Sequence, residues 1–274
     1  MIRVFPRKTK WTPTDELAFV GEPTLFRPGD RSTPVMVSCT FTWDMSAADQ
    51  LRRSWSRFYD RVEVGGPAFG HPGGVFVPGQ FVKEGVTITS RGCPRRCAWC
   101  FAWRREGDIR ELPIRDGWIV QDNNLLATSY EHQRAVFRML DRQPKAAVFS
   151  GGLDTHYLSV RNAAWISHLR VAELWFACDR DYDLDLLRRA RQIFSQVPME
   201  KMRCYVLIGF GRETVQQAED RLEAVYAAGF LPFAQFYQPK CRERRVPRNW
   251  RALVRKWSRP AAYRGVKTGG GGKR

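Results

Sequence analysis

The sequence predicts an α/β fold, in which a partial barrel of six mostly parallel strands follows a small N-terminal α/β extension. Two observations lead to this prediction. Six short runs rich in β-branched and aromatic residues recur at intervals of 27 to 32 residues, close to the length of one strand-helix-strand unit. Helical patterns fill several of these intervals, and parallel strands that alternate with helices form barrels or parts of barrels.

The six predicted strands begin at residues 85, 117, 146, 173, 203 and 231. Their sequences, in chain order, are GVTIT, GWIVQ, AAVFS, ELWFAC, RCYVLIG and LPFAQFY. The interval after the first strand is the weakest unit, because residues 101–116 carry little helical pattern.

Three later intervals contain clear helix signals. Thr128 and Glu131 have the spacing of a capping box ahead of the stretch EHQRAVFRML. One apolar stripe at helical spacing consists of Leu186, Ala190, Ile193 and Phe194. A second stripe, which Gly229 is placed to end, consists of Val215, Ala218, Leu222 and Val225.

Residues 1–84 have a different pattern and are predicted to form the N-terminal extension. PVMVSCTFTW is a predicted buried strand, AADQLRRSWSRFYD a helix and RVEVGG a second strand. The Gly- and Pro-rich stretch GGPAFGHPGGVFVPG marks the boundary before the predicted barrel at 85–240. Residues 241–274 form a basic C-terminal segment, and its end, TGGGGKR, is predicted to be disordered.

Charge and cysteine content narrow the functional classes. Lys and Arg outnumber Asp and Glu by 45 to 28, a formal net charge of +17, which favours acidic partners such as nucleic acid or nucleotides. The chain has no apolar run of about eighteen residues, and MIRVFPRKTK lacks the apolar core of a secretory signal, so we expect a cytoplasmic protein without a membrane partner. Thiols stay reduced in that compartment, so seven cysteines indicate metal or redox chemistry rather than disulfides.

Three of the cysteines are clustered. Cys93, Cys97 and Cys100 lie in ITSRGCPRRCAWCF, directly after the first predicted strand, at the end of the strands where barrel active sites form. A structural zinc site needs a fourth ligand, either a scattered cysteine or one of the histidines His71, His132, His156 and His168. A [4Fe-4S] cluster on three thiolates instead leaves one iron open for a substrate or cofactor.

The spacing Cys93-x3-Cys97-x2-Cys100, with Trp99 before the third cysteine, resembles the cluster motif of the radical S-adenosylmethionine (radical SAM) superfamily. The resemblance covers residues 84–240 and is closest to uncharacterised Fe-S oxidoreductase-type members, including phage-borne ones. It implies a partial (β/α)6 barrel of the radical SAM type, a [4Fe-4S] cluster on the three cysteines, and S-adenosyl-L-methionine as cofactor.

Two further stretches resemble the superfamily at expected strand ends. FSGGLDT is similar to its glycine-rich motif, so the resemblance implies that Gly151 and Gly152 receive the methionine part of the cofactor. The usual acidic residue is replaced there, and Asp154 follows one place later. VQDNNLL is similar to the Asp-Asp-Asn segment of the cobalamin-linked branch, in which Asp122 and Asn123 match and would border the cofactor or substrate.

The resemblance also bears on three more residues. LIGFGRETVQQAEDRL resembles the late strand-loop-helix in which a glycine, here Gly209, approaches the adenosine, and Trp99 would lie near the adenine. Asp179, in ACDRDYDLD, could border the cofactor or substrate, but a solvated acid at a helix start explains it equally well.

The N-terminal extension carries a weaker resemblance. VEVGGPAFG is similar to the end of the cobalamin-binding domain that precedes some radical SAM barrels. The Asp-x-His-x-x-Gly motif that would place a histidine on cobalt is absent from the sequence. We therefore expect residues 1–84 to be a remnant of such a domain, without bound cobalamin.

The resemblance implies an enzyme that takes an electron from a flavodoxin- or ferredoxin-type protein. It would cleave S-adenosylmethionine reductively to methionine and a 5′-deoxyadenosyl radical, and abstract a hydrogen atom from its substrate. No motif specifies that substrate, and the net charge suggests a nucleic-acid base or a nucleotide. The alternative is a metal-stabilised nucleic-acid-binding protein without catalysis.

That alternative depends on the basic ends of the chain. PRKTKWTP and KCRERRVPRNWRALVRKWSRPAAYRGVK interleave basic residues with aromatics, and Arg242, Arg244 and Arg245 are expected to contact phosphate. However, NWRALVRKW also fits an amphipathic helix, and we favour packing onto the barrel by Trp250, Leu253, Val254 and Trp257.

The other four cysteines are scattered singly. Cys178 and Cys204 lie in or beside apolar strands and are predicted to be small buried hydrophobes, Cys241 is predicted to be exposed, and Cys39 has no predicted role.

Overall fold

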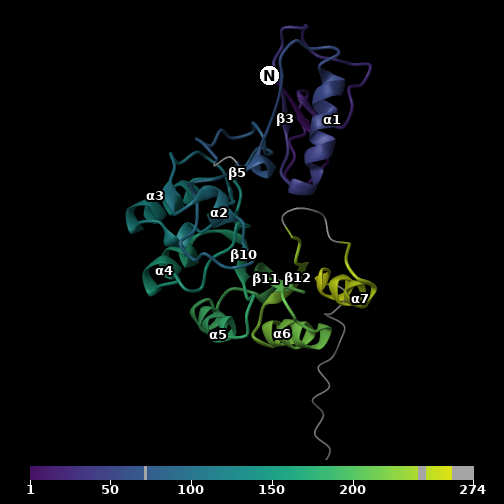
Figure 1. The fold of residues 1–274 in the computed structure, drawn as a ribbon. Helices are drawn as coiled ribbons and strands as arrows, with labels where there is room; N and C mark the ends of the chain where they lie inside the picture. Colours follow the sequence, from purple (N-terminus) through teal and green to yellow (C-terminus); the bar gives the residue numbers. More distant parts are fainter. Residues whose placement is uncertain (71–72, 240–244, 261–274) are drawn as a thin grey trace, which may run out of the picture.

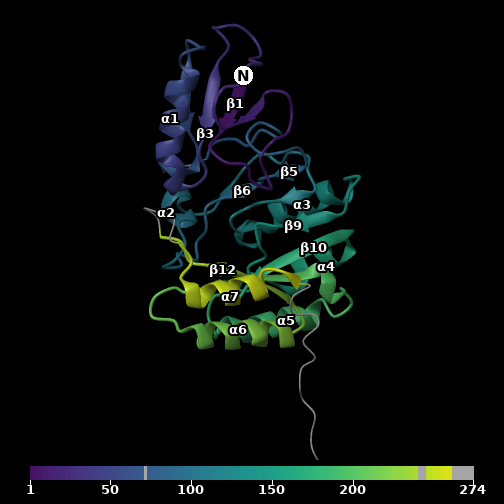
Figure 2. The same ribbon diagram turned by 90° about the vertical axis from the view of Figure 1, so that its right-hand side faces the viewer.

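The computed structural model describes residues 1–70, 73–239 and 245–260, which form two parallel β-sheets with their helices. The first sheet and one helix make up the N-terminal domain, at the top of Figure 1. The second sheet and the remaining helices lie below it, and Figure 2 shows the same arrangement from the side. Both parts belong to the predicted α/β class.

The N-terminal domain contains four strands in the order β2-β1-β3-β4, and every neighbouring pair is parallel. The strands are β1 (Ile2–Phe5), β2 (Ala18–Val20), β3 (Val35–Ser38) and β4 (Val62–Gly65). Helix α1 (Met45–Trp55) covers the sheet with its apolar stripe of Ala48, Leu51 and Trp55. Short 3-10 turns lie at Thr42–Asp44 and Pro67–Phe69.

The two strands predicted in this domain and its helix are present, but β1 and β2 were missed. All four residues of β1 are buried, because this strand lies between β2 and β3 in the middle of the sheet. Ile2, Arg3 and Val4 do alternate between apolar and polar, but the strand has only four residues, which is too short for a distinct pattern. Strand β2 is only three residues long.

All six strands predicted after residue 85 are present, in one parallel sheet with the order β12-β11-β10-β9-β8-β5. Neighbours in the sheet are also successive predicted strands in the chain. The strands are β5 (Val86–Thr87), β8 (Ile119–Val120), β9 (Ala147–Phe149), β10 (Val171–Ala177), β11 (Met202–Ile208) and β12 (Leu231–Phe236).

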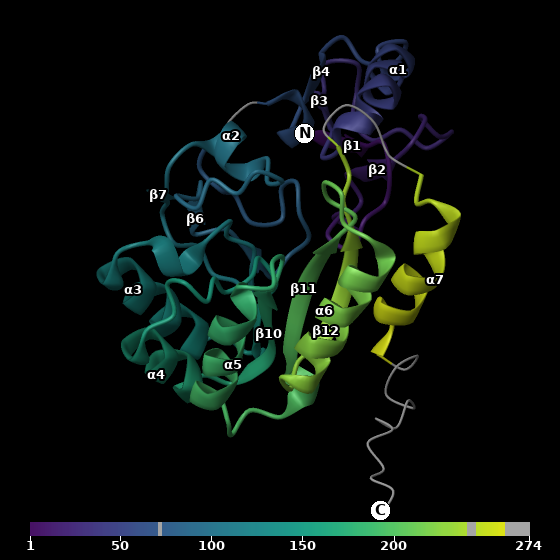
Figure 3. The same cartoon turned by 60° about the horizontal axis from the view of Figure 1, so that its bottom comes forward.

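The helices of this part lie along the outside of the sheet, as Figure 3 shows. They are α3 (Tyr130–Asp141), α4 (Val160–His168), α5 (Asp183–Ile193), α6 (Val215–Ala227) and α7 (Arg248–Trp257), with 3-10 turns η3 (Leu125–Ala127) and η4 (Met199–Lys201). Large buried side chains between sheet and helices include Phe149, Phe176, Phe194 and Phe230. The predicted stripe of α6 belongs to this core, and Gly229 ends that helix with a φ of +87°. In the predicted stripe of α5, Ala190, Ile193 and Phe194 join the core, but the buried leucine is Leu187 and not Leu186.

The predicted capping box of α3 is wrong. Ser129, not Thr128, is the N-cap, and its hydroxyl accepts a hydrogen bond from the backbone N–H of His132. The Thr128 hydroxyl donates to the carbonyl of Leu125 at 2.7 Å instead, which closes the preceding turn η3. That turn moves the start of the helix by one residue.

The interval 101–116, where no helical pattern was evident, contains little regular structure. Helix α2 (Ala102–Glu106) has only five residues, and β7 (Arg110–Glu111) pairs antiparallel with β6 (Ser90–Arg91). This interval also supports the cysteine-containing loop that lies between β6 and α2.

Helix α7 packs on the second sheet, which confirms the predicted burial of its apolar stripe. Trp250, Leu253 and Trp257 are 7%, 4% and 3% exposed and belong to the core beside β12 and α6. Lys256 pairs with Glu219 of α6 at 2.7 Å. The predictions for Cys241, Arg242, Arg244 and the TGGGGKR end concern residues outside the described ranges.

Replacing Leu253 by alanine is expected to lower the free energy of unfolding by about 2 to 3 kcal/mol, because the change leaves a cavity in a buried contact. Arg255→Ala, on the exposed side of the same helix, is the matched control and should change stability by less than about 0.5 kcal/mol. Urea titration of both variants measures the difference. Equal stabilities would contradict the packing of α7.

Within the described part of the chain, no helix is both long enough and apolar enough to cross a membrane.

Candidate functional site

The cysteine loop, residues 92–101, is anchored at its start by a glycine. Gly92 has a φ of +86°, and a Cβ at this position would lie 2.1 Å from the carbonyl oxygen of Asp108. Only glycine tolerates both the left-handed conformation and this approach. Next along the chain, the N–H of Cys93 donates to the carbonyl of Gly107 at 3.1 Å. The loop is therefore held against the segment that follows α2.

The three thiols gather in this loop and influence one another. Burial raises the pKa of Cys97, while the guanidinium of Arg95, which hydrogen-bonds that thiol, opposes the shift. Burial also raises the pKa of Cys100, and the neighbouring Cys93 raises it further. The charge of a bound metal would reverse this trend by stabilising the thiolates.

The side chains of the loop are not arranged around a metal position. Among the described residues, no three His, Cys, Asp or Glu side chains are grouped so that they could hold a metal ion. Zinc needs its sulfur ligands about 2.3 Å from one metal, whereas in a [4Fe-4S] cluster each thiolate binds a different iron. By their chemistry, three thiols in one loop can serve as ligands of either group.

The described histidines have partners or places of their own in the fold. His132 lies on α3, where it pairs with Glu111 at 3.6 Å, and His168 lies at the end of α4. His156 contacts two carboxylates, Asp154 at 3.1 Å and Asp183 at 3.7 Å. His71 is outside the described ranges.

Asp122 and Asn123, which follow β8, hold the strand that leads into the cysteine loop. The N–H of Thr89 donates to Oδ1 of Asp122 at 2.7 Å, and the hydroxyls of Thr89 and Ser90 donate to Oδ2 at 2.6 and 2.7 Å. Oδ1 of Asn123 accepts from the N–H of Gly92 at 3.0 Å. Asp122 is 2% exposed, and this burial raises its pKa. Both side chains therefore position the loop.

Asn124, which sequence analysis missed, joins the cysteine loop to the glycine-rich turn after β9. Its Nδ2 donates to Oδ2 of Asp154 at 2.9 Å and lies 3.4 Å from the sulfur of Cys93. Asn124 is 2% exposed, and its Oδ1 has no hydrogen-bond partner within the described residues. A buried acceptor without a partner is costly unless a ligand supplies a donor.

A charged cluster surrounds Asp154. Arg95 of the cysteine loop lies 3.7 Å from Asp154 and 4.0 Å from Asp183, and His156 contacts the same two carboxylates. Arg95, Asp154 and Asp183 lie in three different segments of the chain. Of the pairs in this cluster, only Asp154 and His156 are close in the sequence. The loop is thus tied electrostatically to the ends of β9 and β10.

Trp99 crosses to the ends of β10 and β11. Its Nε1 donates to Oδ2 of Asp179 at 3.0 Å, while Oδ1 of Asp179 accepts from the N–H of Leu207 at 3.0 Å. The guanidinium of Arg180 lies 4.5 Å from the Trp99 ring, and Phe210 packs against the ring edge to face. Both carboxylate oxygens of Asp179 are thus hydrogen-bonded, and the N-cap of α5 is Tyr182, so the interpretation as a solvated helix-start acid is wrong. Burial also raises the pKa of Asp179.

The three candidate glycines have different surroundings. Gly151 packs closely, since a Cβ would lie 2.2 Å from the carbonyl oxygen of Asp122. Gly152 has a φ of +96° and open space where its Cβ would be, and its N–H donates to the carbonyl of Phe149 at 3.3 Å. Gly209 has a φ of +75°, and a Cβ there would meet the ring of Phe236 at 2.5 Å.

Three of the scattered cysteines are buried. Burial raises the pKa of Cys39 to about 11, that of Cys178 to about 12, and that of Cys204 as well. Such thiols stay protonated and unreactive at neutral pH. The prediction that Cys178 and Cys204 are small buried hydrophobes is confirmed.

No protein-family model matches the chain, and no curated protein shows significant sequence similarity to it.

Proposed function

We propose that the chain is a radical SAM enzyme, whose cysteine loop carries a [4Fe-4S] cluster and whose cofactor is S-adenosyl-L-methionine. The observation that carries the proposal is the convergence of three thiols with Asn124, Asp154 and Trp99 at the carboxyl ends of successive parallel strands. The sequential order of the six parallel strands supports a partial (β/α)6 barrel, in which residues at these strand ends would meet over the sheet.

Cys93, Cys97 and Cys100 would ligate three irons of the cluster and leave the fourth open. In this state the cluster would supply the electron that cleaves S-adenosylmethionine into methionine and a 5′-deoxyadenosyl radical, which takes a hydrogen atom from the substrate. A flavodoxin- or ferredoxin-type protein would supply that electron to the chain. The reduced thiols fit the cytoplasm as the compartment.

The chain's own residues would bind and orient the cofactor. The unpartnered Oδ1 of Asn124 would accept a hydrogen bond from the methionine part, and Asp154 adds a carboxylate beside it. The open space at Gly152 would leave room for that part of the cofactor. Gly151 and Gly209 would allow the close packing of this region. Trp99, held by Asp179 and Arg180, presents a fixed aromatic ring for the adenine.

Asp122 and Asn123 would act on the cofactor site indirectly, through the cysteine loop. Their hydrogen bonds to residues 89–92 hold the base of the cysteine loop, which sets where the three sulfurs stand. We therefore assign them a positioning role.

Metal and sulfide analysis of anaerobically reconstituted protein tests the proposal. About four irons and four acid-labile sulfides per chain are expected, with slow release of 5′-deoxyadenosine from S-adenosylmethionine under reducing conditions. One zinc per chain without sulfide would overturn the proposal. Added cobalamin should not change the release, since the histidine motif for cobalt is absent.

The zinc result would favour the second candidate, a metal-stabilised nucleic-acid-binding protein. One observation supports it: Arg248, Arg251 and Arg255 are exposed on α7. However, the tryptophans of that helix are buried and so cannot stack on bases. Phosphate contacts alone would give binding that weakens steeply with salt and has little sequence preference.

A further inference from the structure

A cavity of about 570 Å³ lies between the N-terminal domain and the second sheet. Its N-terminal wall follows the carboxyl ends of three strands, with Phe5 at the end of β1, Ser38 at the end of β3 and Gly65 at the end of β4. The chain leaves β1 for β2 on one side, and β3 lies on the other side. Ligands of open parallel sheets bind at such a reversal of strand order.

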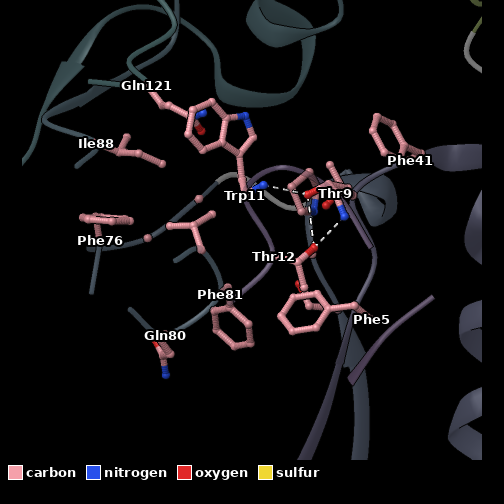
Figure 4. Close-up of a pocket in the computed structure, with 18 of the residues that line it drawn as sticks. Phe5, Thr9, Trp11, Thr12, Phe41, Phe76, Gln80, Phe81, Ile88 and Gln121 are labelled. Carbon is pink, nitrogen blue, oxygen red and sulfur yellow. Dashed lines mark hydrogen bonds between the residues drawn. The ribbon is translucent and has the colours of Figure 1, made fainter. Parts of the chain in front are cut away.

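The aromatic side chains that line this cavity all come from the chain before β5. Trp11, Phe76 and Phe81 are among them, and Figure 4 shows the indole of Trp11 pointing toward Gln121 and Ile88, which follow strands β8 and β5 of the second sheet. The side-chain amide of Gln121 makes no hydrogen bond to any described residue, so it is available to a ligand. Flat apolar faces with a few free amide groups suit a planar heterocyclic ring.

Two arginines in the lining of the cavity carry excess positive charge. Arg91 and Arg105 line it, and together with Arg110 they surround one carboxylate, Glu106, at 3.5, 2.9 and 3.3 Å. One carboxylate cannot neutralise three guanidinium groups. Burial lowers the pKa of Arg91, and its Nε has no hydrogen-bond partner within the described residues. An anionic group with several oxygens would satisfy both the charge and the donor.

We propose that this cavity binds a nucleoside monophosphate, with the base among the aromatic side chains and the phosphate at Arg91 and Arg105. Its size is that of a pocket for a small ligand rather than for a nucleic-acid strand. Asn123 lines the cavity and also holds Gly92, so the ligand lies beside the cysteine loop. The binding itself requires no cluster. Its use as the substrate rests on the proposed function.

Calorimetric titration of the full chain with AMP, GMP, CMP and UMP tests the proposal. At least one monophosphate should bind one per chain, and its nucleoside should bind at least about tenfold more weakly, because it lacks the charge-assisted hydrogen bonds. Inorganic phosphate alone should bind weakly. Absence of binding by all four monophosphates up to millimolar concentration would overturn the proposal.

Paired variants test the location. Arg105→Gln should weaken binding of the monophosphate at least about tenfold and leave that of the nucleoside unchanged. Arg104→Gln, an exposed neighbour outside the cavity, is the control. Gln121→Leu should change the order of preference among the four bases. Equal effects of the two arginine variants, or unchanged preference in the glutamine variant, would place the ligand elsewhere.

Two further readouts separate this inference from the proposed function. S-adenosylmethionine should not compete with the monophosphate, and competition would mean that the nucleotide occupies the cofactor site instead. In reconstituted protein the bound monophosphate should accelerate release of 5′-deoxyadenosine. If the monophosphate binds but no 5′-deoxyadenosine is released, the proposed function is wrong and the cavity assignment stands. If 5′-deoxyadenosine is released but no monophosphate binds, the cavity assignment is wrong and the proposed function stands.

Discussion

Replacing Cys97 by alanine is expected to remove most of the bound iron and to lower 5′-deoxyadenosine release more than about a hundredfold. Mutating a residue that only hydrogen-bonds a metal ligand already lowers metal affinity or activity by about 10- to 100-fold, and loss of a ligand itself should cost more. Two thiols remain in the variant, and an open cluster needs three. Iron and sulfide content, the visible absorption of the reconstituted protein, and product release are measured together.

Cys39→Ala is the matched control. Cys39 is a buried thiol in the N-terminal domain, so its loss should leave iron content and release close to those of the original protein. Thermal unfolding of both variants shows whether either has lost its fold. If Cys97→Ala keeps its iron and its release, these three cysteines are not the cluster ligands.

Asp122→Ala is expected to lower the free energy of unfolding by about 3 to 6 kcal/mol. The carboxylate accepts three buried hydrogen bonds from Thr89 and Ser90, and each donor left without a partner costs about 1 to 3 kcal/mol. Urea denaturation measures the change. Because the cysteine loop begins two residues after Ser90, the variant should also retain less iron than the original protein under the same reconstitution.

The control is a carboxylate that accepts no buried hydrogen bonds. Asp141, exposed at the end of α3, serves this purpose, and Asp141→Ala should change stability by less than about 0.5 kcal/mol. Similar losses in both variants would show that Asp122 does not anchor the loop. A large loss of stability with full iron retention would limit its role to the fold.

The elements that the sequence predicted are those with a local signal. Each of the six strands after residue 85 is a short apolar run at a regular interval, and α6 and α7 show apolar stripes at helical spacing. The cysteine motif is local as well, because its three thiols fall within eight residues. Strand β1 was missed because its four residues are too short a run to stand out, and the N-cap of α3 because an adjacent turn moves it by one residue.

The sequence by itself therefore determined the α/β class, the six parallel strands and the three clustered thiols. Only the tertiary structure decided what surrounds them. Asn124 meets Cys93 from 31 residues away, and Trp99 meets Asp179 from 80 residues away. Parallel strands bring their carboxyl ends together whatever the length of chain between them, so contacts at those ends depend on strand order and not on sequence distance. The cavity behind Trp11 and Arg105 arises in the same way, from two domains whose facing walls share no periodic signal.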